Sequence, residues 1–589
     1  MADPAHVLAE RFRAAFAAAL GPEHADTDAV IRPSAQSRFG DFQANAAMAL
    51  GKTLGRPPRE VAEAVVAALE VDDICSTVEI AGPGFVNLTL REEFVVACLP
   101  AAGDPRLGVE AAPVPRRAVV DYSAPNVAKE MHAGHLRSTI IGDALVRVLE
   151  FLGHPVVRQN HIGDWGTNFG MLIEHLVDLG EDEAAAELSV GDLDAFYKQA
   201  RAKFESDAAF ADRSRARVVT LQSGDEATLR MWRLLVDETM HYVNGVYERL
   251  GVLLTDDDLA GESLYNDMLA PTVDELETGG LAVVNEGALC VFPPGFLNRD
   301  GNPMPLIVRK RDGGFGYDAT DLAAVRYRTR DLDGERLVYV VGADQSQHLA
   351  MVHRAGEMAG WLGAGDDTGD KTVRTAEHVA FGLVLGNDGK RFKSREGESV
   401  KLADLIDEAV ERAARVVAEK NPDLDDDAKA AVAHAVGVGA IKYADLANDR
   451  VKDYTFDWDR MLAMEGNTAP YLQYAHARIR SIFRRAEVDP AVAETGAIVL
   501  AEPAERALAL HLLGFDAAVR ATADHLQPHR LATFLFEVAS AFTSFYEACP
   551  VLRAESPDIR ASRLALCALT ARTLSTGLGL LGIETPDQM

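Results

Sequence analysis

The stretch Asp121–Gly142, DYSAPNVAKEMHAGHLRSTIIG, constrains the fold more than any other part of the chain. The apolar run Arg117–Asp121 at its start predicts a buried strand of a parallel sheet. Pro125 pushes the residue before it out of helical backbone, and apolar residues then recur at helical spacing from Leu136 to Val148. A strand, a loop and a helix N-terminus in this order form the phosphate-binding arrangement of open α/β sheets. The stretch therefore predicts a Rossmann-like, doubly wound α/β domain.

Two histidines, His132 and His135, lie three residues apart at the start of the predicted helix and therefore share one face of it. Gly134 leaves room for a nucleotide to approach the backbone, and Lys129 adds a positive charge one turn earlier. Imidazole N–H groups, the ammonium group and the helix dipole would all stabilise negative charge that develops on a phosphate. Histidines that cap the helix or bind a metal are the alternative, but the strand and loop before them favour phosphate binding.

A second candidate for phosphate binding is the loop 386–397, GNDGKRFKSREG, which follows the apolar run Phe381–Leu385. Two glycine-containing turns bracket four cations there, and the interior fits neither helix nor strand periodicity. A loop of this kind can close on a triphosphate, although a solvated charged loop is the alternative. Together with the histidines it suggests a nucleotide bound across the carboxyl ends of the strands. Its α-phosphate would be attacked, and lysines and arginines would hold the released pyrophosphate.

Length, charge and cysteine usage restrict the class of protein. A chain of 589 residues must form more than one core, and its net charge of −31 argues against bulk electrostatic binding of nucleic acid while leaving room for a local basic patch. The five cysteines include no C-x-x-C pair, so neither a disulfide framework nor a zinc site is expected. No apolar run approaches the ~18 residues of a membrane span, and the N-terminal stretch resembles an amphipathic helix rather than a signal peptide. We therefore expect a reducing, cytoplasmic setting.

The chain divides into three expected units. Residues 1–113 form a small α+β N-terminal domain, with a helix over Arg59–Leu69 and, within Ile80–Leu90, a strand entered through a Gly-Pro-Gly turn. Residues 116–465 form the doubly wound catalytic domain, which a helical insertion at about 181–300 interrupts. Acidic segments of this insertion, such as Asp182–Leu188, are expected on the surface. Further strands are expected at Val156–Gln159, Leu306–Arg309, Leu337–Val341 and Val373–Ala380.

Residues 466–589 show helical periodicity alone, which predicts an all-α bundle. Its helices are expected over Tyr471–Ile482, Ala504–Ala521, Pro528–Tyr546 and Arg560–Leu581. The first of these stretches contains no acidic residue, while arginines accumulate in it and after it. An apolar stripe is expected to be buried, with Gln473, Arg480 and Arg484 on the opposite face. With Tyr471 and Tyr474, the arginines predict a basic, partly aromatic surface for nucleic acid, and a solvated face is the alternative.

These elements resemble those of class I aminoacyl-tRNA synthetases. The segment His132–His135, HAGH, stands for the H-I-G-H signature of that class, and Arg391–Arg395 occupies the place of its K-M-S-K-S loop. The closer resemblance is to the arginyl-tRNA synthetase family, and it covers essentially the whole chain. The segments that carry it are Asp121–Asp143, Asn160–Gly170, Gly314–Ala324, Glu377–Gly397, Gly466–Ile482 and Leu580–Met589. The N-terminal unit resembles the tRNA-elbow-binding domain of this family through RFGDFQANAAMAL and AGPGFVNL.

The sequence departs from the family pattern at two positions. Ser394 stands where class I enzymes usually place their second loop lysine; arginyl enzymes commonly lack it, and Lys129 is thought to substitute for it. Asn168 stands where many relatives have glutamine after Trp-Gly-Thr. The first departure leaves the register of the loop 390–397 on ATP open.

The resemblance implies a pocket for arginine. Asp121 and Asp321 would face the guanidinium group with Tyr317 beside it, and Asn126 and Gln345 would hold the α-amino and α-carboxylate groups. Carboxylates accept the planar fork of arginine in bidentate fashion, whereas lysine offers a point charge. A site whose buried acceptors stay unpaired with the wrong substrate can discriminate by ~10⁴ or more without editing. For each aspartate taken singly, an ordinary surface or capping role is the alternative.

The other expected contacts follow from the motifs and the resemblance together. The expected catalytic residues are His132, His135 and Lys129. Contacts to ATP are expected from Lys129, His132, Gly134, His135, Lys390, Arg391, Lys393 and Ser394. Contacts to tRNA are expected from Arg38, Phe39, Tyr471, Tyr474, Arg480 and Arg484, with a solvated turn as the simpler interpretation of the first two. The C-terminal unit would read the anticodon through splayed bases stacked on aromatic rings and held by arginines.

The implied activity is the ATP-dependent attachment of L-arginine to tRNA(Arg). The arginine carboxylate attacks the α-phosphate of ATP, with Mg²⁺ on the phosphates, and gives arginyl-adenylate and pyrophosphate. The 2′-hydroxyl of the terminal adenosine of the tRNA then displaces AMP. The resemblance further implies that activation needs bound tRNA. Nothing in the sequence resembles a dimerisation segment, so a monomer is expected.

Two alternatives remain at this point. The first is an enzyme of the same superfamily that uses another amino acid or small acid, and the set of Asp121, Tyr317 and Asp321 speaks against it. The second is a non-catalytic paralogue that only binds tRNA. Such a protein would be expected to have lost one of the two histidines or Lys129, and all three are present.

Overall fold

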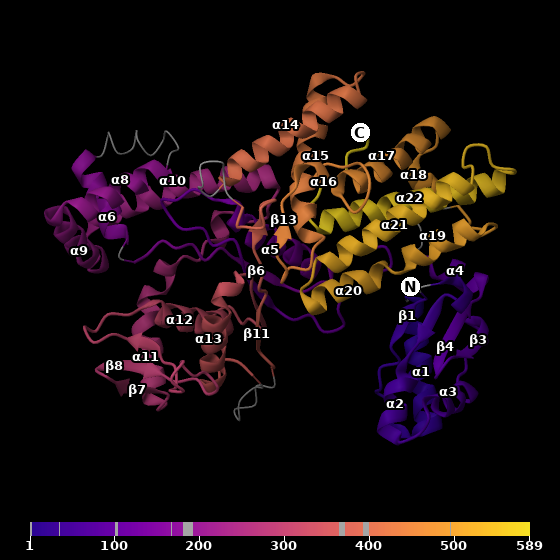
Figure 1. Cartoon of the computed structure of the whole chain (residues 1–589), viewed down its shortest axis with the longest axis horizontal. Coiled ribbons are helices and arrows are strands. Elements are labelled where there is room, and N and C mark those ends of the chain that lie inside the picture. Colours follow the sequence, from indigo (N-terminus) through magenta and orange to yellow (C-terminus); the bar gives the residue numbers. More distant parts are fainter. Residues whose placement is uncertain are drawn as a thin grey trace.

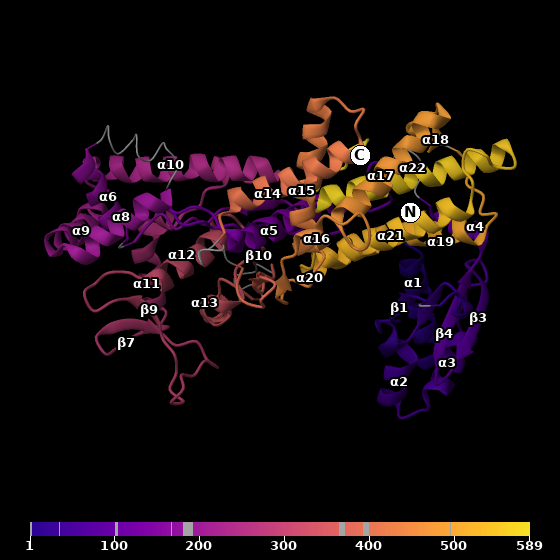
Figure 2. The same ribbon diagram turned by 45° about the horizontal axis from the view of Figure 1, so that its top comes forward.

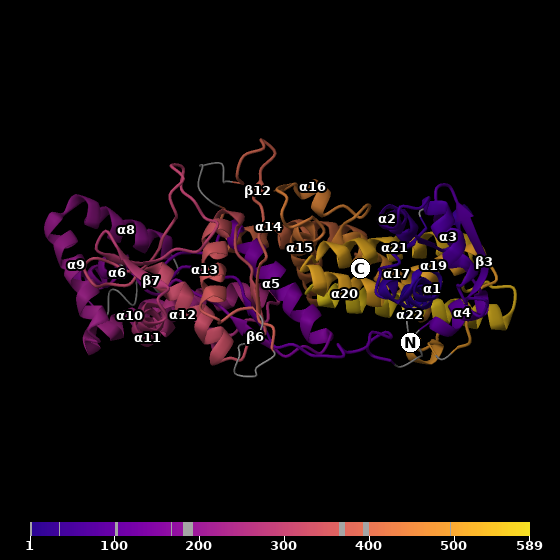
Figure 3. The ribbon, with the colours of Figure 1, turned by 90° about the horizontal axis from the view of Figure 1, so that it is seen from below.

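The computed structural model describes residues 3–34, 36–99, 104–166, 168–180, 193–363, 372–392, 400–494 and 496–589. These residues form an elongated molecule, with helices α8 (Leu193–Ser206), α9 (Ala208–Gln222) and α10 (Glu226–Leu250) at one end (Figure 1). The N-terminal unit lies toward the other end beside the C-terminal helices, as Figure 2 and Figure 3 also show. The parallel sheet lies between the two ends.

The parallel sheet comprises β5 (Ala118–Asp121), β6 (Val156–Gln159), β10 (Arg336–Tyr339) and β11 (Thr375–His378) in the order β11-β10-β5-β6. Every neighbouring pair is parallel. All four residues of β5 are buried, as a continuous apolar run predicts for a central parallel strand. The predicted α/β fold class is confirmed, and four of the five expected strands lie in this sheet within two residues of their expected ends.

The strand order reverses direction at β5. The chain passes through α5 (Ala133–Phe151) to β6 on one side of β5, while β10 pairs with its other side. The helices α6 (Asn168–Leu179), α12 (Tyr317–Arg330) and α13 (Ser346–Met358) belong to the same unit. In open α/β sheets, ligands bind at the carboxyl ends of the strands beside such a reversal. The carboxyl ends of β5 and β10 are therefore where a site is expected.

The insertion is not wholly helical, which corrects the prediction for residues 181–300. After α11 (Asn266–Thr278), the strands β7 (Ala282–Asn285), β8 (Ala288–Val291) and β9 (Leu306–Arg309) form a separate antiparallel sheet. The strand expected at 306–309 is therefore present. It was predicted to lie in the doubly wound sheet, but it belongs to this antiparallel sheet. Its residues alternate between buried and exposed, as in an antiparallel sheet with one solvated face. The expected acidic segment 182–188 lies outside the described residues.

The described residues of 466–589 form an all-α bundle, as predicted. Its helices are α17 (Ala469–Ala486), α18 (Pro490–Ala493), α19 (Pro503–Leu513), α20 (Phe515–His525), α21 (His529–Ala548) and α22 (Pro557–Leu580). The helices α14 (Leu402–Lys420), α15 (Asp426–Leu446) and α16 (Trp458–Met461) precede it and lie in the part predicted to be the catalytic domain. The single helix expected over Ala504–Ala521 is two helices, because α19 ends at Gly514 and α20 begins directly after it. Both pack on α21, so the apolar pattern continues across the break.

The N-terminal unit is α+β. Its antiparallel sheet has the order β1 (Ile31–Pro33), β2 (Phe42–Ala44), β4 (Phe85–Leu90), β3 (Cys75–Ala81), and its helices are α1 (Pro4–Leu20), α2 (Ala46–Leu54), α3 (Pro58–Ala67) and α4 (Glu92–Cys98). The strand expected after the Gly-Pro-Gly turn is present as β4, and β3, which ends at Ala81 before the turn, is its antiparallel partner. Gly82 and Gly84 have φ of 52° and 144°, so the Gly-Pro-Gly segment is a hairpin turn.

No helix in the described ranges is long and apolar enough to cross a membrane. All five cysteines are buried and free of disulfides. Within the same ranges, the structure contains no group of three or more His, Cys, Asp or Glu side chains suited to a metal ion.

A buried ion pair joins the parallel sheet's first helix to α15. Arg137 on α5 places Nε 2.9 Å from Asp445 Oδ2 on α15, and both side chains are at most 1% exposed. The same guanidinium group donates to the carbonyls of Arg450 (3.3 Å) and Lys452 (3.2 Å). This arginine therefore fixes how α5 packs against α15 and the segment that follows it. Arg506 on α19 makes a similar connection to the N-terminal unit through Asp41, at 2.6 Å.

Substitution Arg137→Met should lower the free energy of unfolding by about 3–5 kcal/mol, because Asp445 is left buried without its partner. Urea unfolding followed by circular dichroism measures this loss. The double variant Arg137→Met/Asp445→Leu should recover most of it, since neither charge remains. Arg201→Met is the control: it breaks only the exposed pair with Glu205 and should leave the unfolding curve unchanged. A single variant at Arg137 as stable as the unsubstituted protein would contradict this account.

Candidate active site

The candidate active site lies at the carboxyl ends of the central strands. Asp121 ends β5, and Tyr339 ends β10. Ser138 ties α5 to this edge, because its Oγ donates to the carbonyl of Val340 at 2.6 Å and accepts the N–H of Ser123 at 2.9 Å. The first turns of α5 are thereby held beside the strand ends, where the sequence predicts phosphate binding.

The loop between β5 and α5 is strained. Ser123, Ala124 and Ala128 have φ values of 72°, 50° and 58°, a left-handed conformation that costs on the order of 1–3 kcal/mol for a residue with a side chain. Neighbouring side chains hold the loop: Tyr247 donates its hydroxyl to Ser123 Oγ at 2.6 Å, and Asn160 Oδ1 accepts the N–H of Ala124 at 3.1 Å. Strain persists only where the surroundings enforce it, which is typical of functional sites.

Helix α10 of the insertion supplies much of this support, a role that the sequence did not indicate. Besides Tyr247, it contributes Thr239, whose Oγ1 accepts the N–H of Ala128 at 3.0 Å. Trp232 donates its indole N–H to the carbonyl of Asp164 at 2.7 Å. The insertion is therefore part of the active-site framework.

The two histidines cap α5 and pack on each other. His132 Nδ1 accepts the N–H of Gly134 at 3.0 Å, and His135 Nδ1 accepts the N–H of His132 at 3.0 Å. Their rings stack with centroids 3.9 Å apart and 26° between the planes. Since each Nδ1 accepts a backbone N–H, the proton of each neutral ring must lie on Nε2. The capping role therefore leaves each ring with an Nε2–H donor.

Burial keeps both imidazole rings neutral. It lowers the pKa of His135 to about 3, and the neighbouring His132 and Lys129 add to the shift. Burial also lowers the pKa of His132, and the positive charge of Arg391 adds to that effect. The histidines are therefore suited to bind phosphate as uncharged donors, while positive charge comes from lysine and arginine.

Lys129 lies against the insertion. Its Nζ is 4.6 Å from the centre of the Tyr197 ring on α8, a cation–π contact. The next residue, Glu130, donates its backbone N–H to Asp194 Oδ1 on the same helix at 3.2 Å. Helix α8 therefore positions the segment that leads into the histidines.

The second phosphate-binding candidate is a short hairpin that follows β12 (Val384–Leu385), which pairs with β13 (Tyr454–Thr455). Gly386 donates its N–H to the carbonyl of Lys390 at 2.8 Å, and Lys390 and Arg391 are exposed. The charge of Arg391 reaches His132, so the two candidate elements are close. The expected contacts Lys393 and Ser394 lie outside the described residues.

The residues expected to bind arginine come from three elements. Tyr317 (69% exposed) and Asp321 lie on α12. Gln345 ends the short helix η5 (Ala343–Gln345), and Asn126 lies in the strained loop; both are exposed. Asp321 has one partner already, because its Oδ2 lies 2.5 Å from Nε2 of His348. The Asp321 side chain is still 30% exposed, so a second partner can reach it.

Asp121, by contrast, faces inward. It is 6% exposed, and its Oδ2 accepts a hydrogen bond from Arg328 at 2.8 Å. Arg328 is itself buried and also donates to Gln159 Oε1 at 2.6 Å. Asp121 is expected to face the guanidinium group of bound arginine together with Asp321, but in the structure it is buried and bonds the guanidinium group of Arg328 instead. Arg328 is an internal partner that the sequence pattern did not reveal.

Glu262 is a further candidate that the sequence gave no signal for. It begins the short helix η4 (Glu262–Tyr265). Burial raises its pKa to about 7, and the negative charges of Asp164 and Asp321 add to the shift. A cationic side chain near Glu262 and Asp321 would therefore stabilise the ionised forms of both carboxyl groups.

The expected tRNA contacts are scattered. Arg38 stacks on Phe39 at 4.6 Å in the N-terminal unit. On α17, Tyr474 is exposed, whereas the hydroxyl of Tyr471 bonds Thr543 at 3.1 Å. Arg480 and Arg484 both bond Asp587 near the C-terminus, at 2.9 and 3.0 Å. The placement of Gln473 on the exposed face is wrong: it is fully buried and donates to the carbonyls of Ala435 and Glu584.

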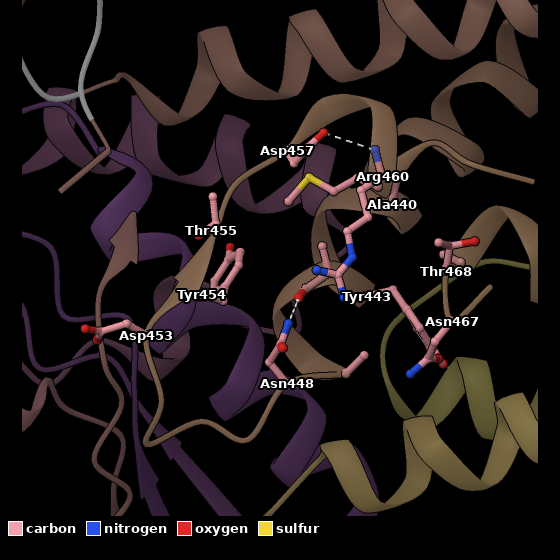
Figure 4. A pocket seen from close by; sticks show the side chains of 14 residues that line it. Ala440, Tyr443, Asn448, Asp453, Tyr454, Thr455, Asp457, Arg460, Asn467 and Thr468 are labelled. Atoms are coloured by element: carbon pink, nitrogen blue, oxygen red, sulfur yellow. Dashed lines mark hydrogen bonds between the residues drawn. The ribbon is translucent and has the colours of Figure 1, made fainter. Parts of the chain in front are cut away.

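A cavity of about 270 Å³ lies beside β13, whose Tyr454 and Thr455 line it (Figure 4). It is lined by the end of α15, by α16 and by the start of α17, and Arg460 points into it (Figure 4). Asp453 connects its wall to the hairpin strand by accepting the N–H of Leu383 at 2.6 Å. None of the expected catalytic residues lines this cavity, so the candidate active site is distinct from it.

Comparison with known proteins agrees with this architecture. Residues 104–458 match the family model "tRNA synthetases class I (R), catalytic domain", residues 472–589 match "DALR anticodon binding domain", and residues 6–90 match "Arginyl tRNA synthetase N terminal domain". Together with the histidine pair at the sheet's carboxyl edge, these matches define a class I tRNA synthetase.

Proteins that are similar to this chain over its full length identify the family within this class. An arginine–tRNA ligase of Thermobifida fusca is 57% identical, and each chain is 100% covered. One from Edwardsiella ictaluri is 51% identical over 99% of each chain. The crystal structure of arginyl-tRNA synthetase from Plasmodium falciparum superposes over 100% of both chains with a TM-score of 0.85 at 28% identity. The chain belongs to the arginine–tRNA ligase family, which confirms the resemblance inferred from the motifs.

The tautomer and charge of the histidines can be measured directly. The ring nitrogens of His135 should show the neutral Nε2–H form throughout pH 5–8, because its pKa is lowered to about 3. Two-dimensional NMR of the protein labelled with ¹⁵N-histidine reports both the tautomer and the titration. The variant His135→Gln assigns the signal by its loss. A protonated His135 at pH 6 would contradict the proposed electrostatics.

Proposed function

We propose that this chain activates L-arginine with ATP and transfers it to tRNA(Arg), releasing pyrophosphate and AMP. One observation carries the proposal: two chemistries meet at the carboxyl ends of β5 and β10. The capped histidines of α5 offer neutral donors for phosphate, and Asp321 with Glu262 offers acceptors for a cationic side chain. An amino acid held by its side chain on the acidic side would present its carboxylate to a nucleotide on the other.

In the first step, a carboxylate oxygen of arginine attacks the α-phosphorus of ATP, which enters as its magnesium complex. Negative charge grows on the α-phosphate oxygens, and donors already in place stabilise it without reorganisation. The Nε2–H groups of His132 and His135 serve as these donors, with the N–H of Gly134 and the ammonium group of Lys129. Pyrophosphate leaves, and arginyl-adenylate remains.

The hairpin after β12 takes the leaving group. Lys390 and Arg391 are exposed there and close to His132, so their charges are available to the β- and γ-phosphates. Lys393 and Ser394 continue the same loop and are assigned the same role.

The arginine side chain binds between Asp321 and Glu262, with the Tyr317 ring beside it, and Asn126 and Gln345 hold the α-amino and α-carboxylate groups. Two carboxylates that repel each other in the empty site gain most from a planar cation that bonds both. Asp121 acts indirectly, because it holds Arg328, which lies seven residues after Asp321 on α12.

In the second step, the 2′-hydroxyl of the terminal adenosine of tRNA displaces AMP. The N-terminal unit binds the tRNA elbow through Arg38 and Phe39, and α17 contacts the anticodon arm through Tyr471, Tyr474, Arg480 and Arg484. The last two arginines must exchange Asp587 for phosphate. Activation of arginine waits for bound tRNA. We further infer that the enzyme acts as a monomer in the cytoplasm, where five free cysteines stay reduced.

Pyrophosphate exchange tests this function. Exchange of labelled pyrophosphate into ATP should depend on arginine and on tRNA, and lysine or citrulline should not replace arginine. The variant His135→Ala should lower the exchange rate by about 10²–10³-fold, the loss typical of one donor to a developing oxyanion. It should still bind tRNA. His241→Ala, an exposed histidine on α10, is the matched control. Pyrophosphate exchange supported by another amino acid, or no exchange with arginine and tRNA present, would contradict the proposed function.

The contact between Tyr197 and Lys129 gives a second test. Tyr197→Ala should slow adenylate formation about two- to thirtyfold, because a cation–π contact contributes roughly 0.5–2 kcal/mol to positioning the ammonium group. Tyr197→Phe keeps the ring and should retain most of the rate. In a Lys129→Ala background, Tyr197→Ala should cause little further loss. Equal, additive losses in both backgrounds would mean that the ring acts elsewhere.

A further inference from the structure

His348 bonds Asp321, the residue whose carboxylate is proposed to receive the guanidinium group of arginine. His348 on α13 places Nε2 2.5 Å from Asp321 Oδ2, and its Nδ1 lies 3.7 Å from Asp318 Oδ1. The ring of Tyr317 packs on His348 with centroids 5.0 Å apart. A flat ring with two nitrogens therefore lies between two carboxylates and beside an aromatic ring. These are the contacts that a planar guanidinium group would seek.

The charges around His348 favour its protonated form. Burial lowers its pKa, but the hydrogen bond and charge of Asp321 and the charge of Asp318, both on α12, outweigh burial and raise the pKa above its ordinary value. On α13 itself, His353 adds no charge, because burial lowers its pKa to about 4. The negative charge of Asp321 also raises the pKa of Glu262 on η4. The imidazolium of His348 therefore supplies a cation to the carboxylates of Asp318 and Asp321.

We propose that His348 is a specificity-determining residue of the arginine pocket, whose imidazolium stands in for the substrate's guanidinium group and loses a proton when arginine binds. The proposal rests on the proposed function, because the ligand is arginine. On binding, the Nδ1–H bond of His348 breaks and the proton passes to water. The neutral ring keeps its Nε2–H bond to Asp321. One positive charge enters and one leaves, so the net charge of the pocket is unchanged.

This exchange favours ligands that resemble the cation they replace. A second positive charge beside the imidazolium in a partly buried site disfavours the protonated ring, which is why the proton leaves. A neutral analogue such as citrulline does not expel the proton and has to compete with an ion pair that stays intact. A lysine ammonium group brings the charge but cannot bond two carboxylates through a planar fork.

Glu262 is a second group that can release a proton, since its pKa lies at about 7 in the empty site. Two variants separate the sources. His348→Gln keeps an amide N–H for Asp321 but cannot titrate, and Glu262→Gln removes the other source. His353→Gln is the matched control, because that histidine is on the same helix and is already neutral.

Isothermal titration of L-arginine into the full-length enzyme at pH 7, in buffers of different ionisation enthalpy, counts the protons. The unsubstituted enzyme and His353→Gln should release on the order of one proton, and His348→Gln clearly less. Because protons leave on binding, affinity should rise about three- to tenfold from pH 6 to pH 7.5, and this rise should be smaller in His348→Gln. The profile of the unsubstituted enzyme is a test that needs no variant.

The outcomes are distinguishable. Arginine binding with equal proton release in His348→Gln, or with affinity independent of pH in the unsubstituted enzyme, overturns this inference and leaves the proposed function standing. No arginine binding, either alone or with tRNA present, overturns both. The inference is supported if fewer protons are released when arginine binds to His348→Gln. The variant Glu262→Gln measures the contribution of Glu262 separately.

Discussion

The guanidinium group of Arg328 holds together the carboxyl edge of the central sheet, and the rest of the site is built on that edge. It bonds Asp121 at the end of β5 (2.8 Å) and Gln159 at the end of β6 (2.6 Å), and it lies 4.9 Å from the ring centre of Tyr339 at the end of β10. One buried cation therefore joins α12 to three strands. Because a buried charge that loses its partner is strongly destabilising, α12 and its Asp321 cannot shift independently of the strand ends.

Charge is distributed unequally across the site. The half-buried positions at the start of α5 are filled by neutral imidazole rings, which can donate hydrogen bonds without the cost of desolvating a cation. The cations Lys390 and Arg391 lie instead on an exposed hairpin, where water solvates them until an anion arrives. The negative charge around Asp321 is reduced in a similar way. The raised pKa of Glu262 favours its neutral form, and the raised pKa of His348 favours its cationic form.

Sequence patterns predicted what is local in this molecule. An apolar run, a Pro-Asn turn and a helical stripe were enough to predict β5, the loop after it and α5. The H-x-G-H spacing predicted that both histidines lie on one face at the start of α5. The patterns failed where a partner is distant: residues 306–309 are a strand, but nothing local indicates that β8 is its neighbour. The internal partners of the two aspartates, Arg328 and His348, were missed for the same reason. Which charges meet is decided by tertiary packing, not by spacing.

Helix α10 has a consequence for the history of this fold. It is 25 residues long, about 37 Å from end to end, and it also packs against α9 and α6. Its inner part bonds the strained backbone at Ser123 and Ala128. The insertion is therefore not an independent module. A relative that shortened or replaced it would need other hydrogen-bond partners for the loop that positions the histidines.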